Sequence, residues 1–572
     1  MLQRTLREHV ESVVRELFPG IDMPAFTVVS PEREELGDYA CNVAMILART
    51  FKKNPIEIAS EIAAKLSKAA PEFIKKSEVA GSGFINIFLK DEVMLVSLKE
   101  ALTRPLAWGK STEGNGRTVI VEYFQLNIAK EPHVGHLRSA VIGDSLKRIL
   151  HALGYHVISD THVGDWGTQF GILLYAYKEA IRHNEAVREK IKSNPFTELQ
   201  SLYVSANAEE GIREKGKAEF AKLEQGDKEN REIWQWMVDI SMQKLGESAT
   251  RLKLLAFEEH RGESMYEEMM PPIVEHALAT GVAKKIEDGA VVVDLTHEGL
   301  DEAVLVKSDG ATTYLLRDLA TIKYRKEKWK FWKNLYVVDN RQSHHFRQVF
   351  RVAELLGFEG TRDSEHVELG FMKLPEGAMS TRAGNVISLE AVLDEAEQRA
   401  YKVIKEKNPD LRDAEQVAKK VGLGAIKYFD LSHDRTSDIV FRWEDVLSFE
   451  GNTGPYIQYT YARFRSILRK AGEFTPVFSD HMDLDSDSRG LLFHCLRLPE
   501  AMERVRDTWS PHLLAGFLFD LAQKANEFYH ARPILSQKDE QKKLFLLMLV
   551  QMVILTLANG LYLLGIDAPE EM

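Results

Sequence analysis

The sequence predicts an α/β multidomain protein built around a parallel sheet, and two observations lead to this expectation. An apolar, β-branched run from Thr118 to Phe124 is followed by a helical pattern, LRSAVIGDSLKRILHALGY, and then by a second strand pattern, His156 to Asp160. This β-α-β order calls for a doubly wound parallel sheet of the Rossmann-like kind. From about residue 401 onward the pattern is nearly all helical, which predicts a C-terminal all-α bundle.

The chain before this sheet predicts a separate N-terminal α+β module at residues 1–110. It opens with an amphipathic helix, continues with the helical stretch CNVAMILARTFKKNPIEIASEIAAKL, and ends with a short strand, FINIFL, preceded by Gly81-Ser82-Gly83. A glycine-rich, polar stretch at 108–116 then predicts a linker.

The Rossmann-like unit is expected at residues 115–400, with a helical insertion at about 174–290, where the chain becomes highly charged. The second half of the sheet, with the strand patterns AVVVDL, AVLVKS and NLYVVDN, ends near STRAGNVISLEAVLDEA. The helical unit then occupies residues 401–572.

Bulk composition is that of an ordinary soluble protein, with 44% apolar and 28% charged residues in a chain of 572. Cys41 and Cys495 lie far apart and have no C-x-x-C partner, which excludes a zinc ribbon and argues against a disulfide framework. A reducing cytoplasm fits this cysteine usage. The net charge of -12 argues against a protein that coats nucleic acid indiscriminately.

One uncharged segment, 544–566, is about long enough to cross a bilayer. Polar residues and glycines interrupt it and no basic cluster follows it. We therefore expect a buried helix of the bundle rather than a membrane anchor. We also expect the protein to be a monomer that does not bind membranes.

The most informative motif is the H-x-G-H sequence from His133 to His136, at the predicted turn between strand and helix. A helix N-terminus exposes unpaired N–H groups and a partial positive charge, so phosphate binds there readily. Gly135 lets a nucleotide approach the backbone. The two histidines can donate hydrogen bonds to a phosphate whose charge grows as a bond breaks. These features predict nucleotide chemistry, although such histidines can also simply cap a helix.

The wider sequence NIAKEPHVGHLRSAVIGDSLKRIL, together with THVGDWGTQFG, resembles the pattern of arginyl-tRNA synthetases, a family of class I aminoacyl-tRNA ligases. GDYACNVAMILA with GSGFINIFL and the C-terminal LANGLYLLGIDAPEEM are similar to the same family. The resemblance implies an arginine–tRNA ligase that uses L-arginine, ATP and tRNA(Arg). It also implies that Mg²⁺ enters with ATP; no protein ligand for it can be assigned.

The resemblance assigns roles to residues of the central unit. ATP is expected at His133, Gly135 and His136, with the two histidines and Lys130 as catalytic residues. The arginine-binding residues implied by the family are Glu122, Asn127, Tyr314, Asp318 and Gln342. Without the family, Asp318 could equally be an N-cap or an ion-pair partner of a nearby arginine, and Asn127 a turn residue.

Two departures from the family pattern affect these expectations. Where most class I synthetases have K-M-S-K-S, this chain has Ala378-Met379-Ser380-Thr381-Arg382, which lacks both lysines. We expect Met379, Ser380 and Arg382 to bind ATP, and Lys130 to compensate for the missing lysines. The second departure is Phe124-Gln125-Leu126, where the family has a serine-rich lead with a proline. Phe124 either narrows the arginine pocket or points into the core.

The flanking units are expected to bind tRNA. By resemblance the N-terminal module contacts the tRNA elbow through Phe84 and Asn86, although without the family Phe84 is interpreted as a core residue. The helical unit is expected to read the anticodon, with Tyr456, Tyr459 and Arg463 as candidate contacts. Two other functions remain open on the motif alone: a small-molecule nucleotidylyltransferase and a non-catalytic RNA-binding relative.

Overall fold

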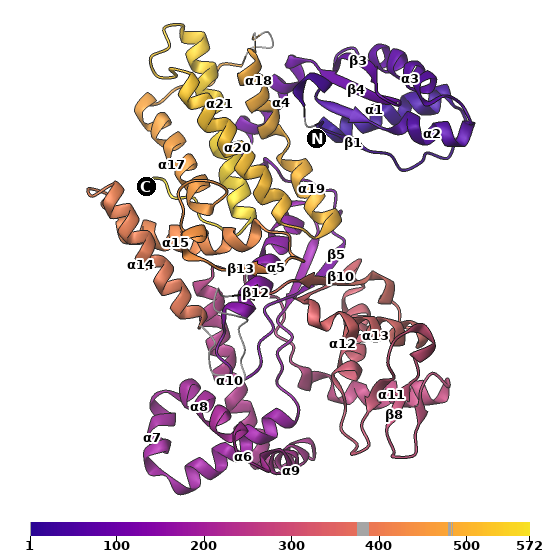
Figure 1. Ribbon diagram of the computed structural model, residues 1–572, viewed down its shortest axis with the longest axis vertical. Coiled ribbons are helices and arrows are strands. Elements are labelled where there is room, and N and C mark those ends of the chain that lie inside the picture. Colours follow the sequence, from indigo (N-terminus) through magenta and orange to yellow (C-terminus); the bar gives the residue numbers. More distant parts are fainter. Residues whose placement is uncertain (1, 32, 374–387, 479–481, 483) are drawn as a thin grey trace.

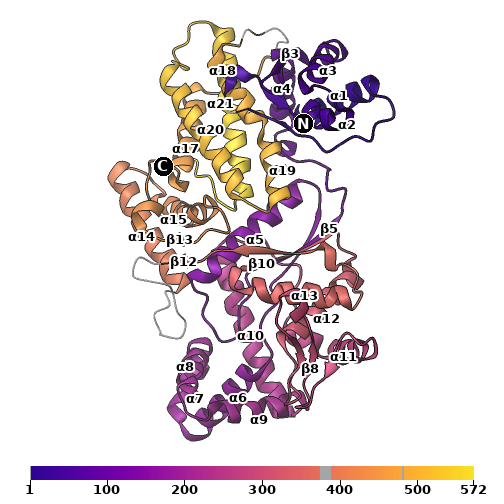
Figure 2. The same ribbon diagram turned by 45° about the vertical axis from the view of Figure 1, so that its right-hand side comes forward.

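The computed structural model describes residues 2–31, 33–373, 388–478, 482 and 484–572. The N-terminal module and the C-terminal helices lie side by side at one end of an elongated molecule. The central sheet follows, and a helical insertion and a small α/β unit form the other end (Figures 1 and 2).

The N-terminal module is a four-stranded antiparallel sheet with helices packed on it. The strand order is β1-β2-β4-β3. Its elements are α1 (Leu2–Leu17), β1 (Val28–Val29), β2 (Tyr39–Cys41), α2 (Val43–Phe51), α3 (Pro55–Ala69), β3 (Ile74–Ala80) and β4 (Phe84–Leu89). Helix α4 (Asp91–Thr103) leads out of the module toward the bundle, where it contacts α18. The expected α+β character of this region is confirmed.

The central sheet is parallel and doubly wound, as predicted. Its order is β11-β10-β5-β6, from β5 (Thr118–Glu122), β6 (His156–Asp160), β10 (Lys333–Asp339) and β11 (Ser364–Leu369). Helix α5 (Val134–Ala152) connects β5 to β6, and α13 (Ser343–Leu355) connects β10 to β11. The chain therefore leaves the centre in both directions, and β5 and β10 lie at the point where the direction changes.

A single serine of α5 ties these two strands together. The Ser139 hydroxyl donates to the Val337 carbonyl at 2.7 Å and accepts the N–H of Phe124 at 3.0 Å. Both strands therefore end at a defined position relative to the first turn of α5.

The expected helical insertion is present after β6, but its helices end at Arg251 and not near residue 290, because residues 270–290 belong to the next unit. It consists of α6 (Thr168–His183), α7 (Glu185–Ser193), α8 (Pro195–Asn207), α9 (Ile212–Glu224) and α10 (Lys228–Arg251). In both views α6 to α9 lie below the sheet, at the end of the molecule far from the C-terminal helices.

The next strand patterns do not join the parallel sheet, contrary to the expectation. AVVVDL and AVLVKS form β8 (Val291–Val293) and β9 (Ala303–Val306), which pair with β7 (Lys284–Lys285) in a separate antiparallel sheet. This sheet packs with α11 (Met270–Ala279) and α12 (Tyr314–Trp329) around an apolar core that also includes residues of β10 and α13. Apolar, β-branched strands look alike in either sheet, and only the partner decides.

Helices dominate the rest of the chain. They are α14 (Leu389–Lys407), α15 (Ala414–Leu431), α16 (Trp443–Val446), α17 (Gly454–Ala471), α18 (Ser486–Leu496), α19 (Leu498–Thr508), α20 (His512–Ala531) and α21 (Glu540–Leu563). A short parallel pair, β12 (Met372–Lys373) with β13 (Ile439–Val440), joins this region to the end of the central unit.

Helix α21 is the one helix among the described residues that is long and apolar enough to cross a membrane. In its most apolar window, 72% of the residues are buried inside the protein. It runs through the bundle and packs against α17, α18 and α20. This burial is what a core helix of a bundle requires.

Candidate active site

A cavity of about 550 Å³ lies at the carboxyl ends of β5 and β10, where the two halves of the sheet meet. Open parallel sheets bind their ligands at this position. The predicted site residues that line it are Glu122, Asn127, Gly135, His136, Tyr314, Asp318 and Gln342. The fold therefore brings together side chains that lie up to about 220 positions apart in the sequence.

The H-x-G-H turn is a reciprocal helix cap built from the two histidines. His133 is the N-cap of α5, and its Nδ1 accepts the N–H of Gly135 at 3.0 Å. The Nδ1 of His136 accepts the N–H of His133 at 3.1 Å. A Cβ on Gly135 would lie 2.8 Å from the His133 ring, so only glycine fits between the histidines. Capping and ligand binding are therefore compatible, because capping uses only Nδ1.

This hydrogen bonding sets the state of both rings. With Nδ1 as acceptor, the proton of each neutral imidazole lies on Nε2. Burial, followed by the charge of Lys130, lowers the pKa of His133 to about 4. Burial, followed by His133, lowers the pKa of His136 to about 3. The ring centroids are 3.9 Å apart, so the pair offers two neutral N–H donors at one helix start.

Lys130 lies beside this turn but not in the wall of the main cavity. Its ammonium is 5.4 Å from the centre of the Tyr203 ring, on the helical insertion. Burial lowers its pKa. It lines a small neighbouring cavity that shares Leu126 and Asn127 with the main one. His133 is likewise absent from the wall of the main cavity and reaches it through His136.

Asp318 is the acidic centre of the opposite wall. His345 Nε2 donates to Asp318 Oδ2 at 2.6 Å, and His162 Nε2 lies 3.9 Å from Oδ1. Burial opposes a charge on each of these histidines, but nearby carboxylates outweigh it and raise the pKa of both. Asp318 is thus neither an N-cap nor the ion-pair partner of an arginine among the described residues.

Glu122 belongs to a buried charge cluster under the cavity. Arg325 lies 2.5 Å from Glu122 Oε2 and 2.8 Å from Asp160 Oδ2, and Gln125 donates to Glu122 Oε1 at 2.7 Å. Glu122, Asp160 and His162 are close enough to hold a metal ion. Because the Arg325 guanidinium already neutralises the two carboxylates, a Mg²⁺ ion does not fit there.

Three other predicted residues lie at the rim of the cavity. Tyr314 is the first residue of α12 and is 58% exposed, and Gln342 directly precedes α13. Asn127 is exposed and lies against Gly164 of the THVGDWG segment. A Cβ at Gly164 would approach Asn127 Oδ1 to 2.3 Å, so the glycine makes room for the amide.

Phe124 points into the core and does not narrow the pocket. Its side chain is fully buried and its φ is +59°, in the left-handed region. Gln125 and Leu126 line the cavity instead. The unusual lead into Asn127 therefore changes the pocket through the amide of Gln125, not through the phenylalanine ring.

The remaining predicted positions lie after β12 in the sequence and in the N-terminal module. Met379, Ser380 and Arg382 lie outside the described residues. Phe84 is 39% exposed, so it is not the core residue that was the alternative, whereas Asn86 is buried within the N-terminal sheet at 5% exposure. Asn86 as it stands presents little surface to an RNA.

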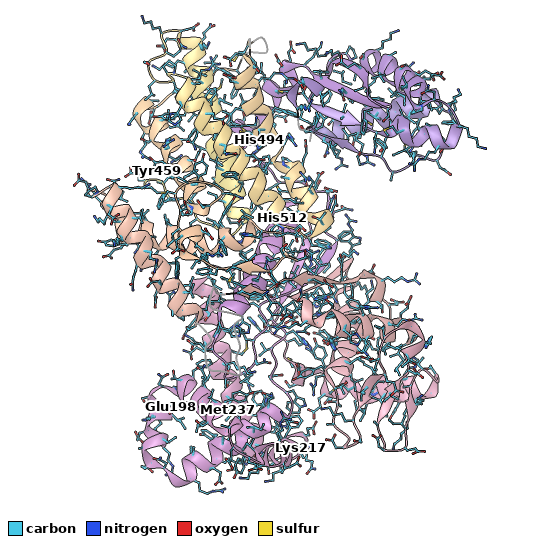
Figure 3. The ribbon with its side chains drawn as sticks, in the orientation of Figure 1. Glu198, Lys217, Met237, Tyr459, His494 and His512 are labelled. Atoms are coloured by element: carbon cyan, nitrogen blue, oxygen red, sulfur yellow. The ribbon has the colours of Figure 1, made fainter. Side chains whose placement is uncertain are left out.

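The candidate anticodon residues gather on α17. Tyr459 and Arg463 line a groove of about 930 Å³ together with Tyr529 and Arg532. The Arg463 guanidinium lies 4.7 Å from the centre of the Tyr459 ring and 5.5 Å from that of Tyr529. Figure 3 shows Tyr459 on the side of the bundle that carries the C-terminus.

Tyr456 lies off this groove. It is half-buried, and its hydroxyl accepts a hydrogen bond from the amide of Asn526.

Sequence reasoning missed several polar residues of the cavity: His162, Glu263, Arg317 and His345. His162 follows the carboxyl end of β6, at the same sheet edge where Glu122 ends β5, so the same rule could have found it. Glu263 and His345 carried no comparable signal, because only the folding of distant segments brings them to the site.

Family models cover almost the whole chain. Residues 4–89 match the arginyl tRNA synthetase N terminal domain, residues 97–443 match the catalytic domain of tRNA synthetases class I (R), and residues 457–572 match the DALR anticodon binding domain.

Similar proteins extend over the full length. An arginine–tRNA ligase of Fusobacterium nucleatum is 37% identical and covers 100% of this chain and 99% of its own. One of Halothermothrix orenii is 38% identical over 95% of each chain. Arginyl-tRNA synthetase of Thermus thermophilus superposes with a TM-score of 0.83 at 29% identity, over 100% of both chains. That of Plasmodium falciparum gives 0.83 at 25% identity, over 100% of this chain and 99% of its own.

Proposed function

The chain belongs to the arginyl-tRNA synthetase family of class I aminoacyl-tRNA ligases, and from this premise we propose how its residues perform arginine–tRNA ligation. The enzyme activates arginine with ATP to arginyl-adenylate and transfers it to the 2′-hydroxyl of the terminal adenosine of tRNA(Arg). One observation carries the residue assignments: the phosphate-binding helix start and a carboxylate-rich wall face one cavity at the switch point of the sheet.

Arginine is bound on the acidic wall. A guanidinium presents a planar fork of N–H donors, which distinguishes it from the point charge of lysine. Asp318 and Tyr314 bind this fork, while Asn127 and Gln342 hold the α-amino end at the rim. Glu122 contributes to the pocket from beneath the cavity, because Arg325 and Gln125 already bind its carboxylate oxygens.

ATP lies across the start of α5, with its adenine near Gly135 and its phosphates near His133 and His136. The arginine carboxylate attacks the α-phosphate in line and pyrophosphate leaves. Charge develops on the phosphate oxygens in this step, so fixed N–H donors and a cation contribute more than a general base. The Nε2–H groups of the two histidines are these donors, and the ammonium of Lys130 is the cation. Met379, Ser380 and Arg382 are proposed as further ATP contacts on the resemblance alone.

Mg²⁺ accompanies ATP as a bound counterion of its phosphates, without an assigned protein ligand. The protein acts in the cytoplasm as a monomer, away from membranes. Two buried free cysteines and the burial of most of α21 support this proposal.

The tRNA spans the molecule. Its anticodon enters the groove of Tyr459 and Arg463, where aromatic rings stack on unpaired bases and the arginine contacts phosphate. Tyr456 supports this groove from inside the bundle. The elbow of the tRNA contacts the N-terminal module at Phe84, with Asn86 beneath Phe84 in the same strand, β4. We assign residues 1–110, 115–400 and 401–572 to these elbow, catalytic and anticodon functions.

Arginine-dependent ATP–pyrophosphate exchange tests the proposal. Each amino acid is tried with and without tRNA, and we expect exchange with arginine alone and only when tRNA is added. Exchange with pantetheine phosphate or a nicotinate nucleotide would instead identify a small-molecule nucleotidylyltransferase. Tight tRNA binding without exchange under any condition would identify a non-catalytic relative.

A further inference from the structure

The Asp318 carboxylate is held asymmetrically. His345 Nε2 donates to Oδ2 at 2.6 Å, whereas Oδ1 has no hydrogen-bond donor among the described residues; its nearest basic atom is His162 Nε2, at 3.9 Å. Only 14% of the Asp318 side chain is exposed. One carboxylate oxygen is therefore occupied and oriented, and the other is left without a donor in a residue that lines the cavity.

The His345 ring is itself fixed in place. It is the third residue of α13, and its ring packs edge-on against Phe346, with centroids 5.5 Å apart. Phe346 is 4% exposed and packs in turn on Tyr336 of β10 and on His366 of β11. The donor that orients Asp318 is thus anchored to the central sheet, while Asp318 belongs to α12 of the adjacent unit.

We propose that His345 is a positioning residue for arginine recognition, which holds Asp318 in the rotamer that presents Oδ1 to the guanidinium. The proposal rests on the proposed role of Asp318. A carboxylate has about four lone-pair sites, so one hydrogen bond from His345 leaves enough acceptors for a forked cation. Orientation by a second residue is how binding sites hold a charged group ready without reorganisation.

A positioning role for His345 predicts that its loss changes the KM for arginine selectively. Without the His345 donor, Asp318 gains rotamer freedom, and arginine must order it on binding. The cost falls on arginine binding and not on the chemical step, because His345 does not line the phosphate side. The KM for arginine should rise, while kcat and the KM for ATP stay close to those of the native enzyme.

The test uses the full-length protein with tRNA in ATP–pyrophosphate exchange. His345→Gln keeps an N–H donor at about the reach of Nε2, whereas the amide of His345→Asn reaches only the position of Nδ1. We expect His345→Asn to raise the KM for arginine about tenfold or more and His345→Gln to stay within about threefold of the native value. His344→Asn is the matched control, because His344 faces the exposed Asp301, at 3.4 Å, and not the cavity.

The outcomes test the positioning role of His345 and the arginine-binding role of Asp318 separately. An unchanged arginine KM in His345→Asn, or an equal rise in both His345 variants, overturns the positioning role. Asp318→Asn tests the underlying assignment, and a normal arginine KM in that variant overturns the role of Asp318 itself. Melting temperatures of all variants are measured alongside; if His345→Asn melts early, the exchange assays are run below its melting temperature, where an arginine KM equal to that of His345→Gln overturns the role.

Discussion

Arg138 lies 3.2 Å from Asp430, and both side chains are almost completely buried. Arg138 is in the second turn of α5, just after the H-x-G-H cap, and Asp430 is near the end of α15. Arg138 also donates to the Ser437 carbonyl at 2.8 Å. Helix α5 is therefore locked to the helical part of the chain by a charge pair that water does not reach.

We expect Asp430→Leu to destabilise the protein by about 3–5 kcal/mol, because it leaves the Arg138 charge buried without its partner. The double variant Arg138→Met/Asp430→Leu removes both charges and should recover much of this loss. Urea unfolding followed by circular dichroism measures both. Equal unfolding midpoints for the native protein and Asp430→Leu would contradict a structural role for the pair.

His133→Asn separates capping from catalysis. Asparagine is a strong N-cap, so the variant should keep the start of α5 and lose less than about 1 kcal/mol of stability. It lacks the Nε2–H that we assign to the phosphate, so exchange should fall about a hundredfold. Thermal melting and ATP–pyrophosphate exchange on the same preparation test this. If activity persists alongside a normal melting temperature, His133 serves only as a cap.

Lys130→Ala should abolish most adenylate formation and leave folding intact. The lysine is only partly buried, and its visible contact is the face of the Tyr203 ring. Loss of a cation that offsets phosphate charge should lower kcat by about a hundredfold or more. Lys217→Ala, on the remote part of the helical insertion (Figure 3), is the control and should exchange normally. Near-normal exchange in Lys130→Ala refutes the compensating role.

The raised pKa of the Glu263 carboxyl predicts that arginine binding depends on pH. Burial raises its pKa to about 7, although Arg317 lies 3.1 Å away and opposes this shift. A cationic guanidinium entering the cavity stabilises the ionised form, so arginine binding near pH 7 should release protons. Titration calorimetry in buffers of different ionisation enthalpy measures this release, and Glu263→Gln should remove a part of it. A release that is identical in Glu263→Gln excludes this group.

The raised pKa of Glu263 also makes the stability of the folded protein depend on pH. Because the folded state holds this proton more tightly than the unfolded chain, the contribution of Glu263 favours folding below the unfolded pKa of about 4.5. It is lost as the pH rises toward 7. Glu263→Gln should therefore be relatively more stable than the native protein at pH 8 than at pH 5.

Much of the fold could be predicted from local patterns. The β-α-β order around the H-x-G-H turn correctly predicted the doubly wound sheet, and charge density correctly predicted the helical insertion. The strands AVVVDL and AVLVKS were assigned to the wrong sheet. Short apolar strands carry no information about their partners, which lie elsewhere in the chain.

The structural setting of His133 and His136 could be predicted, because one short motif contains both the residues and the helix start that they cap. The setting of a residue could not be predicted where distant segments of the chain form it. Nothing local to RQSHHF distinguishes His345, which faces Asp318, from His344, which faces the surface. Likewise, the pairing of Arg325 with Glu122 and Asp160 depends on three separate elements that meet beneath the cavity.

The decisive measurement is a crystal structure of the full chain with arginine and a non-hydrolysable ATP analogue. We expect the guanidinium on Asp318 Oδ1, with His345 still bound to Oδ2, and the triphosphate within hydrogen-bond distance of the Nε2 atoms of His133 and His136. A guanidinium bound away from Asp318, or phosphates that approach neither histidine, would contradict it.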